Sequence, residues 1–223
     1  LERTATKPGD SILEIGCGWG SFAEAAARAS RKVHGLTLST EQKAYVESRM
    51  NAAGLGGVEV SLIDYRDVAG QYDAVASIEM VEAVGEAYWP AYLGAIARAL
   101  KPGGRAAIQY IAIDDAIFDA YARNVDFIQT YVFPGGLLLS ESKFRAIAAE
   151  QGLSWHDRHE FGLDYAETLK CWRERFDDAV TAGRIPAEFD PHFIDLWRYY
   201  LMYCEGGFRG GGIWVAQVTL IKD

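Results

Sequence analysis

The chain has 223 residues, half of them hydrophobic, with a formal net charge of −9, so it has enough apolar material for one substantial core. The acidic balance argues against a general nucleic-acid binder, because phosphates attract basic surfaces. No apolar run reaches the roughly 18 residues of a membrane-spanning helix, and the first ten residues do not read as a signal peptide, which favours a cytoplasmic protein.

Strand-like and helix-like segments alternate through the first half of the chain. Ser39 or Thr40 is suited to cap the second helix, which ends near Gly54, and the run Lys101-Pro102-Gly103-Gly104 stops the third. This alternation is typical of an α/β fold with a parallel sheet and right-handed crossovers. The predicted strands are 11–16, 32–38, 57–63, 72–78 and 105–113, and the predicted helices are 20–30, 39–55 and 88–100.

The second half is richer in helices and aromatic residues. It adds predicted helices over 114–133, 140–152, 164–183 and 191–208, and predicted strands over 153–162 and 212–221, giving a mostly parallel sheet of seven strands. We therefore interpret residues 1–223 as a single domain with helical insertions at about 114–136 and 164–208. Ligands of open α/β sheets bind at the carboxyl ends of the strands, so these insertions are expected to act as a lid.

A glycine-rich turn follows the first predicted strand. Its spacing, Gly16-x-Gly18-x-Gly20, is one residue shorter than a dinucleotide fingerprint, which disfavours a pyrophosphate. Glu14 lies at the end of the strand, and a carboxylate there suits an amine-bearing or cationic ligand. A tight turn without a ligand is the alternative.

Polar and aromatic residues follow the next two strands. Thr37 and Gln42 occupy the place where a dinucleotide fold usually carries an acid that holds a ribose. Tyr65 follows the third strand and is suited to cover a flat purine ring. Ordinary packing for Tyr65 and a solvated helix position for Gln42 are the alternatives.

The cysteines and histidines do not suggest a metal site. Cys17, Cys171 and Cys204 are far apart in the sequence and form no Cys-x-x-Cys pair, so free thiols in a reducing compartment are expected. His156 and His159 share a strand face only if a bulge separates them, and we expect them on the surface.

The run "LEIGCGWG" resembles motif I of class I S-adenosylmethionine-dependent methyltransferases. Over essentially the whole chain, the ordered segments resemble the cyclopropane-fatty-acyl-phospholipid synthases, including the mycolic-acid cyclopropane synthases. The segments are LEIGCGWGSFAEAAA, GLTLSTEQ, DYRD, YDAVASIEMVEAVG, ALKPGG, VFPGG, FGLDYAETLKCWRERF and YYLMYCEGGFRGGGI.

The resemblance implies a Rossmann-like fold and S-adenosylmethionine as cofactor. It implies that the backbone around Gly16 and Gly18 lies against the methionine part, and that Ser77 and Ile78 border the sulfonium. The ribose and adenine are then expected to be faced by Thr37, Leu38, Gln42, Tyr65 and Arg66.

The resemblance also implies a catalytic base. In this family a bicarbonate ion is held by a Glu, a His, a Tyr, a Cys and main-chain groups; Glu82, Tyr165 and the main chain of Ile111 match three of these. Gln109 stands at the His position and can donate a hydrogen bond but carry no charge. The Cys belongs to an N-terminal segment that precedes the matching region in the family and closes the cofactor pocket, so the sequence reads as a catalytic-domain fragment or as a protein whose pocket is covered by something else.

The leading hypothesis is a C-methyltransferase that acts on the cis double bond of an unsaturated acyl chain, as phospholipid, giving a cyclopropane or methyl-branched chain. Peripheral membrane contact and a dimer are compatible with it. The alternatives are a methyltransferase of a small molecule and an inactive cofactor-binding scaffold, because one fold serves many acceptors. Part of the aromatic block is expected to line an acyl tunnel, with candidates Phe127, Tyr131, Phe133, Trp172, Trp197, Tyr199, Tyr200 and Phe208.

Overall fold

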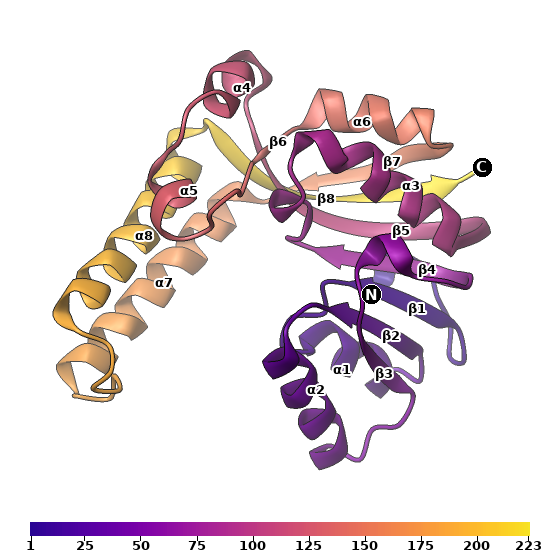
Figure 1. Cartoon of the computed structure of the whole chain (residues 1–223), viewed down its shortest axis with the longest axis horizontal. Helices are drawn as coiled ribbons and strands as arrows, with labels where there is room; N and C mark the ends of the chain where they lie inside the picture. Colours follow the sequence, from indigo (N-terminus) through magenta and orange to yellow (C-terminus); the bar gives the residue numbers. More distant parts are fainter.

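The computed structural model describes all 223 residues, and its centre is one mixed sheet (Figure 1). The strands are β1 (Ser11–Ile15), β2 (Lys32–Thr37), β3 (Val58–Leu62), β4 (Tyr72–Ile78), β5 (Leu100–Ile113), β6 (Leu139–Ser140), β7 (Leu153–Glu160) and β8 (Ile213–Lys222). They follow the order β3-β2-β1-β4-β5-β8-β7, with β6 paired to β5. β1 to β5 pair in parallel, and β8 runs antiparallel between β5 and β7. The mostly parallel sheet is confirmed, with the two-residue β6 as an addition.

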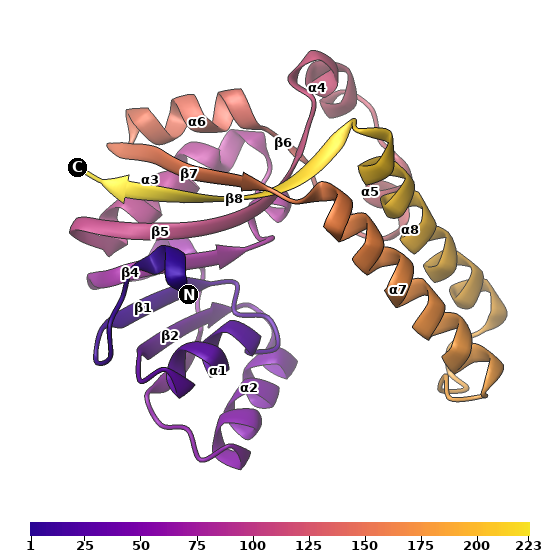
Figure 2. The same ribbon diagram turned by 180° about the vertical axis from the view of Figure 1, so that it is seen from behind.

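Helices cover both faces of the sheet (Figures 1 and 2). Successive strand residues point to opposite faces: Ile12 and Ala74 pack against one helix layer, whereas Leu13 and Val75 pack against the other. The first layer holds α1 (Ser21–Arg28) and α2 (Thr40–Ala52), and the second holds α3 (Trp89–Ala99) and α6 (Glu141–Glu150). As predicted, Ser39 caps α2, because its side chain accepts a hydrogen bond from the Gln42 N–H.

The largest apolar cluster lies between the sheet and the α3–α6 layer. Its centre is the fully buried ring of Phe144, whose neighbours are Trp89, Tyr92, Tyr110 and Trp155. Aromatic side chains bury large areas and favour tilted or edge-to-face contacts. This cluster makes the centre of the sheet a rigid support for the ends of β4 and β5.

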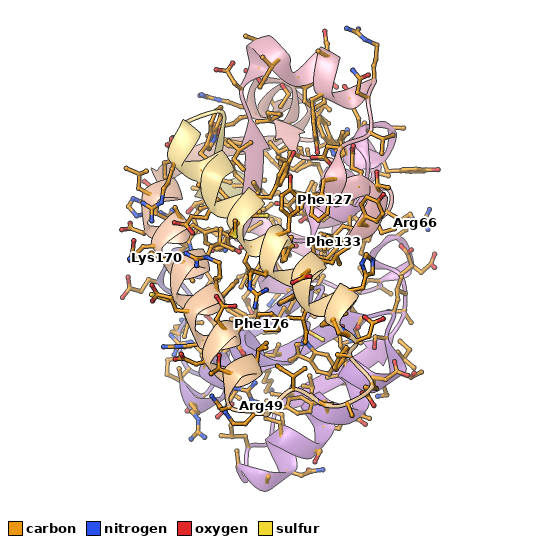
Figure 3. All side chains as sticks on the ribbon, turned by 90° about the vertical axis from the view of Figure 1, so that its left-hand side faces the viewer. Arg49, Arg66, Phe127, Phe133, Lys170 and Phe176 are labelled. Carbon is orange, nitrogen blue, oxygen red and sulfur yellow. The ribbon has the colours of Figure 1, made fainter.

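Four helices fall in the two predicted insertions: α4 (Asp115–Ala122), α5 (Phe127–Tyr131), α7 (Gly162–Thr181) and α8 (Pro191–Gly210). α7 and α8 form an antiparallel pair that projects beyond the sheet (Figures 1 and 2). Leu201 and Phe208 of α8 pack with Ala166 and Leu169 of α7 against Val215 of β8, which anchors the base of the pair. Phe127 and Phe133 lie beside α8 (Figure 3).

Two local features differ from or refine the expectations. β5 starts at Leu100 rather than near Arg105, because Leu100 pairs with Tyr72 before the register shifts. The register of β7 also shifts between His156 and His159, and both imidazoles are exposed, as predicted. None of the helices combines the length and the hydrophobicity that a membrane span requires.

Candidate functional site

The glycine turn lies at the carboxyl end of β1 and has backbone angles that suit glycine. Gly16, Gly18 and Gly20 have φ values of +76°, +50° and +79°, in the left-handed region where a Cβ is strained. A Cβ on Gly16 would come 2.9 Å from the Cγ of Met80, whereas one on Gly18 would meet nothing within 4 Å. The turn is therefore closed against Met80 at its start and open at Gly18, where a ligand can approach the backbone.

Glu14 lies beneath this turn as an unpaired acid. Its side chain is 3% exposed, and one carboxyl oxygen, Oε2, is buried without a hydrogen-bond partner. Burial raises the pKa of Glu14 to about 8, since a charge is poorly solvated in the interior. A buried acid without a partner fits a ligand that brings a positive charge or an N–H donor.

The end of β2 adds a small polar cluster next to β1. The Thr37 hydroxyl donates to the Gln42 Oε1 at 2.7 Å and accepts from the Ser39 N–H at 3.1 Å. Leu38 between them is 76% exposed. The structure thus brings Thr37, Leu38 and Gln42 together, with an amide, a hydroxyl and an exposed aliphatic side chain.

Tyr65 and Arg66 lie in a short turn after β3 and differ in their freedom. The Tyr65 ring meets Tyr92 edge to face, with centroids 5.5 Å apart. Arg66 is exposed and pairs with Asp64 at 2.8 Å. Tyr65 is therefore a fixed ring. Arg66 is a surface group, and its guanidinium would have to contact a ligand and Asp64 at the same time.

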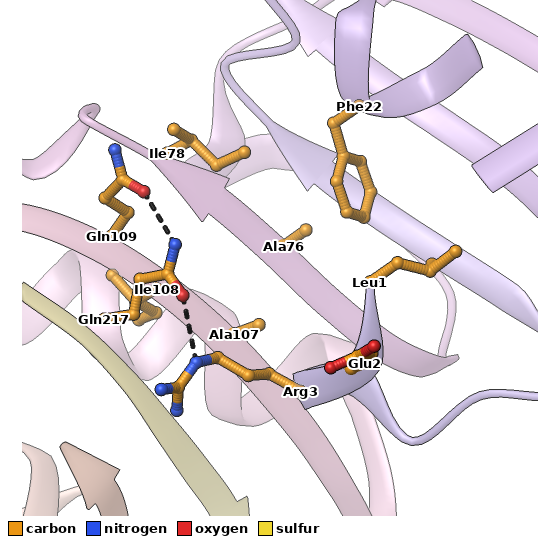
Figure 4. A pocket seen from close by; sticks show the side chains of 10 residues that line it. All are labelled: Leu1, Glu2, Arg3, Phe22, Ala76, Ile78, Ala107, Ile108, Gln109 and Gln217. Carbon is orange, nitrogen blue, oxygen red and sulfur yellow. Dashed lines mark hydrogen bonds between the residues drawn. The ribbon is translucent and has the colours of Figure 1, made fainter. Parts of the chain in front are cut away.

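Ser77 and Ile78 end β4 and point to opposite faces. Ser77 is fully buried, and its hydroxyl donates to the Ile15 carbonyl at 3.1 Å, which ties β4 to β1. Ile78 lines a pocket of about 520 Å³ on the α1 side of the sheet (Figure 4). Of the two, only Ile78 offers its side chain to an open space.

Glu82 lies in the segment after β4, and its carboxyl group is buried. Its Oε1 accepts a hydrogen bond from the Ile111 N–H, whereas its Oε2 has no partner. Burial raises the pKa of Glu82 to about 8, and the negative charge of Glu79 adds to this effect. Glu82 is thus held partly as a neutral acid near pH 7, with its free oxygen available to a ligand.

Glu79, which the motifs in the sequence do not single out, is the centre of the second cluster. It has a positive φ of 50°, unusual for a residue with a Cβ and often found at functional sites. Its Oε1 accepts from the Gln109 amide at 2.7 Å, and its Oε2 accepts from the Tyr165 hydroxyl at 2.9 Å. The only signal in the sequence is an acid three residues before Glu82.

A chain of hydrogen bonds extends from this cluster to the N-terminal turn (Figure 4). The Arg3 guanidinium donates to the side-chain oxygen Oε1 of Gln217 at 3.0 Å, and the Gln217 side-chain amide donates to the Gln109 Oε1 at 2.9 Å. Arginine only donates and an ionised carboxylate only accepts. Together, Arg3 and Glu79 therefore fix the orientation of both amides, with the Gln109 N–H aimed at Glu79.

Aromatic side chains surround the Tyr165 end of this cluster. The Tyr165 ring lies 5.1 Å from Phe208 and 6.3 Å from Trp172, centroid to centroid. Burial and the charge of Glu79 raise the pKa of Tyr165, so its hydroxyl stays protonated as a donor. Phe133 meets Tyr200 of α8 in the same aromatic block. Five of the predicted aromatic candidates lie on α7 and α8, and the other three lie on α5 or just after it. The expectation of a tunnel stays a prediction.

The comparison with known proteins agrees with this arrangement. The family described as mycolic acid cyclopropane synthetase matches residues 1–218. Tuberculostearic acid methyltransferase UfaA1 of Mycobacterium tuberculosis is 42% identical over 100% of this chain and 52% of the relative. Cyclopropane-fatty-acyl-phospholipid synthase of Escherichia coli is 35% identical over 99% of this chain and 56% of the relative. The chain therefore spans about half the length of these curated relatives.

Solved structures agree with the sequence matches. Mycolic acid cyclopropane synthase CmaA1, in a complex with SAH and CTAB, superposes with a TM-score of 0.90 at 27% identity, over 100% of this chain and 81% of the other. The cyclopropane synthase MmaA2 of Mycobacterium tuberculosis gives the same TM-score and identity, over 99% of this chain and 81% of the other. The predicted fold and resemblance are confirmed, and the chain belongs to the mycolic acid cyclopropane synthetase family.

Proposed function

We propose that this chain binds S-adenosylmethionine and transfers its methyl group to the cis double bond of an unsaturated acyl chain in a lipid. The observation that carries the proposal is the contact between the glycine turn and Met80. Met80 lies in the same short segment as Glu79 and Glu82. A donor on the turn would therefore lie beside a pair of acids and the aromatic side chains of α7 and α8.

The residues at the turn fit the proposed cofactor. The buried, unpaired Glu14 oxygen suits the α-amino group of the methionine part, and the open backbone at Gly18 gives that part room. Thr37, Gln42 and the Tyr65 ring supply polar and flat surfaces for the ribose and adenine. When bound, the cofactor supplies an electrophilic methyl group.

The second cluster fits an alkene acceptor. An alkene is a weak nucleophile, so it must be aligned with the methyl group in a site that excludes water. Methyl addition leaves a positive charge on carbon, which negative groups and the faces of aromatic rings stabilise. Glu79 supplies a negative charge, and Tyr165 with its ring neighbours supplies the aromatic surface. A base must then take a proton from the product.

The bicarbonate that the resemblance implies does not fit these residues. Glu79 already accepts the hydrogen bonds of the Tyr165 hydroxyl and the Gln109 amide, and Glu82 accepts that of the Ile111 N–H. An anion placed among them would face the negative charge of Glu79 and find the Tyr165 O–H and the Ile111 N–H already donated. We therefore assign no step to bicarbonate.

The names of the relatives support a lipid acceptor and leave two products to compare. One relative is named for tuberculostearic acid and another for cyclopropane fatty-acyl phospholipids. We propose that the acceptor is an unsaturated phospholipid and that the product is a cyclopropane, or a methylene-branched chain that becomes methyl-branched only when a separate reductant supplies a hydride. Contact with a membrane surface would deliver such an acceptor to the α7–α8 side of the chain.

The test is incubation with methyl-labelled S-adenosylmethionine and vesicles of unsaturated phospholipid, followed by mass analysis of the fatty acids. A labelled gain of one methylene unit is expected, and degradation to locate the added carbon distinguishes a ring from a methylene branch. Cofactor binding without any mass gain would refute the acyl acceptor. Label on an added small molecule instead would favour a small-molecule methyltransferase, and binding without turnover on any acceptor would favour a scaffold.

A further inference from the structure

Carboxyl groups of the chain itself occupy hydrogen-bond donors that the resemblance assigns to the bicarbonate ion. Four groups were expected to hold that ion: Glu82, Gln109, Tyr165 and the Ile111 main chain. In the structure the Gln109 amide, the Tyr165 hydroxyl and the Ile111 N–H each donate to a carboxyl group of the chain itself. Tyr165 has a single O–H, and because it donates this to Glu79, it has no donor left for an anion.

Both carboxyl oxygens of Glu79 accept a hydrogen bond, and the two donors come from different elements of the fold. Gln109 of β5 holds Oε1 and Tyr165 of α7 holds Oε2, so the group is fixed rather than free to rotate. Its backbone has a positive φ that few residues with a Cβ adopt. A conformation of this kind persists only where surrounding contacts maintain it.

From this geometry we infer that Glu79 takes the place of bicarbonate and is itself the general base of the proposed reaction. The inference rests on the proposed function and names the base for it. Glu82 differs from Glu79 in its contacts, because one of its carboxyl oxygens has no partner whereas both oxygens of Glu79 accept hydrogen bonds. The pKa of Glu82, about 8, keeps much of that group neutral at pH 7. Two neighbouring acids with different environments commonly divide the roles of base and neutral donor in this way.

The step balances without a further reactant. The alkene electron pair forms a C–C bond to the transferred methyl while the S–CH₃ bond breaks, leaving S-adenosylhomocysteine and a carbocation. Glu79 takes a proton from the added methyl, and that C–H electron pair closes the third bond of a cyclopropane. If a hydride first shifts to the cationic carbon, the same proton loss gives a methylene branch. In either case Glu79 then releases the proton to solvent.

The hydrogen-bond chain explains why glutamine suits position 109 in this arrangement. An imidazolium there would attract a mobile anion, whereas a neutral amide that is oriented by Gln217 and Arg3 donates to a fixed carboxylate. Glu79 and Gln109 thus act as a matched pair. Substitution of Gln109 is expected to act through the position of Glu79, so Gln109 is a positioning residue.

The first test compares turnover in decarbonated buffer with turnover after addition of bicarbonate. Wild-type turnover is expected to be the same in both. Glu79→Gln should lose about 10²- to 10⁴-fold, the usual contribution of a general base. Glu79→Gly suits the positive φ and empties the space of the side chain. Added bicarbonate should therefore raise the turnover of this variant at least about tenfold. The matched control is Glu86→Gln, which removes an exposed acid that pairs with Lys143 and should leave turnover unchanged.

A second test needs no turnover: ¹³C-labelled bicarbonate is titrated into the cofactor-free protein and followed by ¹³C NMR. Wild type should not bind it, whereas Glu79→Gly should. Bicarbonate binding to wild type, bicarbonate-dependent wild-type turnover, or a Glu79→Gly variant that neither binds nor responds to bicarbonate would each overturn the inference. Wild type that modifies no acyl chain would refute the proposed function, and the NMR result would still decide whether Glu79 fills the anion's place.

Discussion

Replacing Glu14 with glutamine should change two properties in opposite directions. The buried carboxyl has a pKa of about 8 instead of its ordinary 4.5. Between these pH values the native state keeps a proton that the unfolded state has lost, so the stability of the unliganded protein falls as pH rises through this window. At about 1.4 kcal/mol per pKa unit, the loss at alkaline pH is at most about 5 kcal/mol.

Glu14→Gln removes this penalty because the amide is neutral at every pH in the window. We expect wild type and variant to have similar unfolding free energies at pH 5, and the unliganded variant to be more stable by a few kcal/mol at pH 8. Urea unfolding at the two pH values measures the difference. Glu82 titrates in the same range in both proteins, so subtracting the two curves isolates Glu14.

The affinity of Glu14→Gln for the cofactor should fall, although its stability rises. Removing one member of a buried, hydrogen-bonded charge pair costs about 2–5 kcal/mol, which is at least roughly a 30-fold rise in Kd. Calorimetry with S-adenosylhomocysteine, which carries the same amino group, measures this. Glu59→Gln, at an exposed position of β3, is the matched control. An unchanged Kd would show that Glu14 does not bind the amino group of the ligand. A variant less stable than wild type at pH 8 would contradict the raised pKa of Glu14.

Three further outcomes follow from other residues. Glu82→Gln should lower turnover at least about 100-fold while changing the Kd for S-adenosylhomocysteine less than about twofold; turnover that survives unaltered would exclude Glu82 from the reaction. A thiol reagent should label one cysteine quickly, because Cys171 is exposed whereas burial raises the pKa of Cys17 to about 11 and that of Cys204 to about 12; quick labelling of Cys17 would contradict the structure. Phe144→Ala should lower the unfolding free energy by about 3–5 kcal/mol, and an unchanged urea midpoint would contradict the central place of this ring.

Much of the fold could be predicted because the signals are local. The alternation of apolar strands with helices that end at Gly54 or at Lys101 to Gly104 predicts the parallel sheet from neighbouring residues alone. β6 could not be predicted, because a strand of two residues is too short to show any periodicity. The start of β5 was misplaced because Pro102 and the following glycines look like a loop, although Leu100 pairs with Tyr72.

The first part of the site could be predicted for the same reason. Glu14 and the glycines lie within a few residues of a strand end, where parallel sheets bind ligands. What the sequence could not supply is the state of Glu14: its Oε2 is buried with no partner, which depends on the packing of three strands and a helix layer.

Glu79 shows why the second part of the site, around Glu79 and Glu82, could not be predicted from the sequence. In the sequence it is an acid in a loop, and Gln109, thirty residues later, reads only as a departure from a histidine. The register of β4 with β5 pairs Ile78 with Gln109, so the residue after Ile78 must end beside that amide. Tyr165 reaches the same carboxylate from a helix more than eighty residues away. Since a neutral amide at 109 or an acid at 79 alone would weaken an anion site, and together they build a fixed carboxylate, the roles of the two residues can be understood only as a pair.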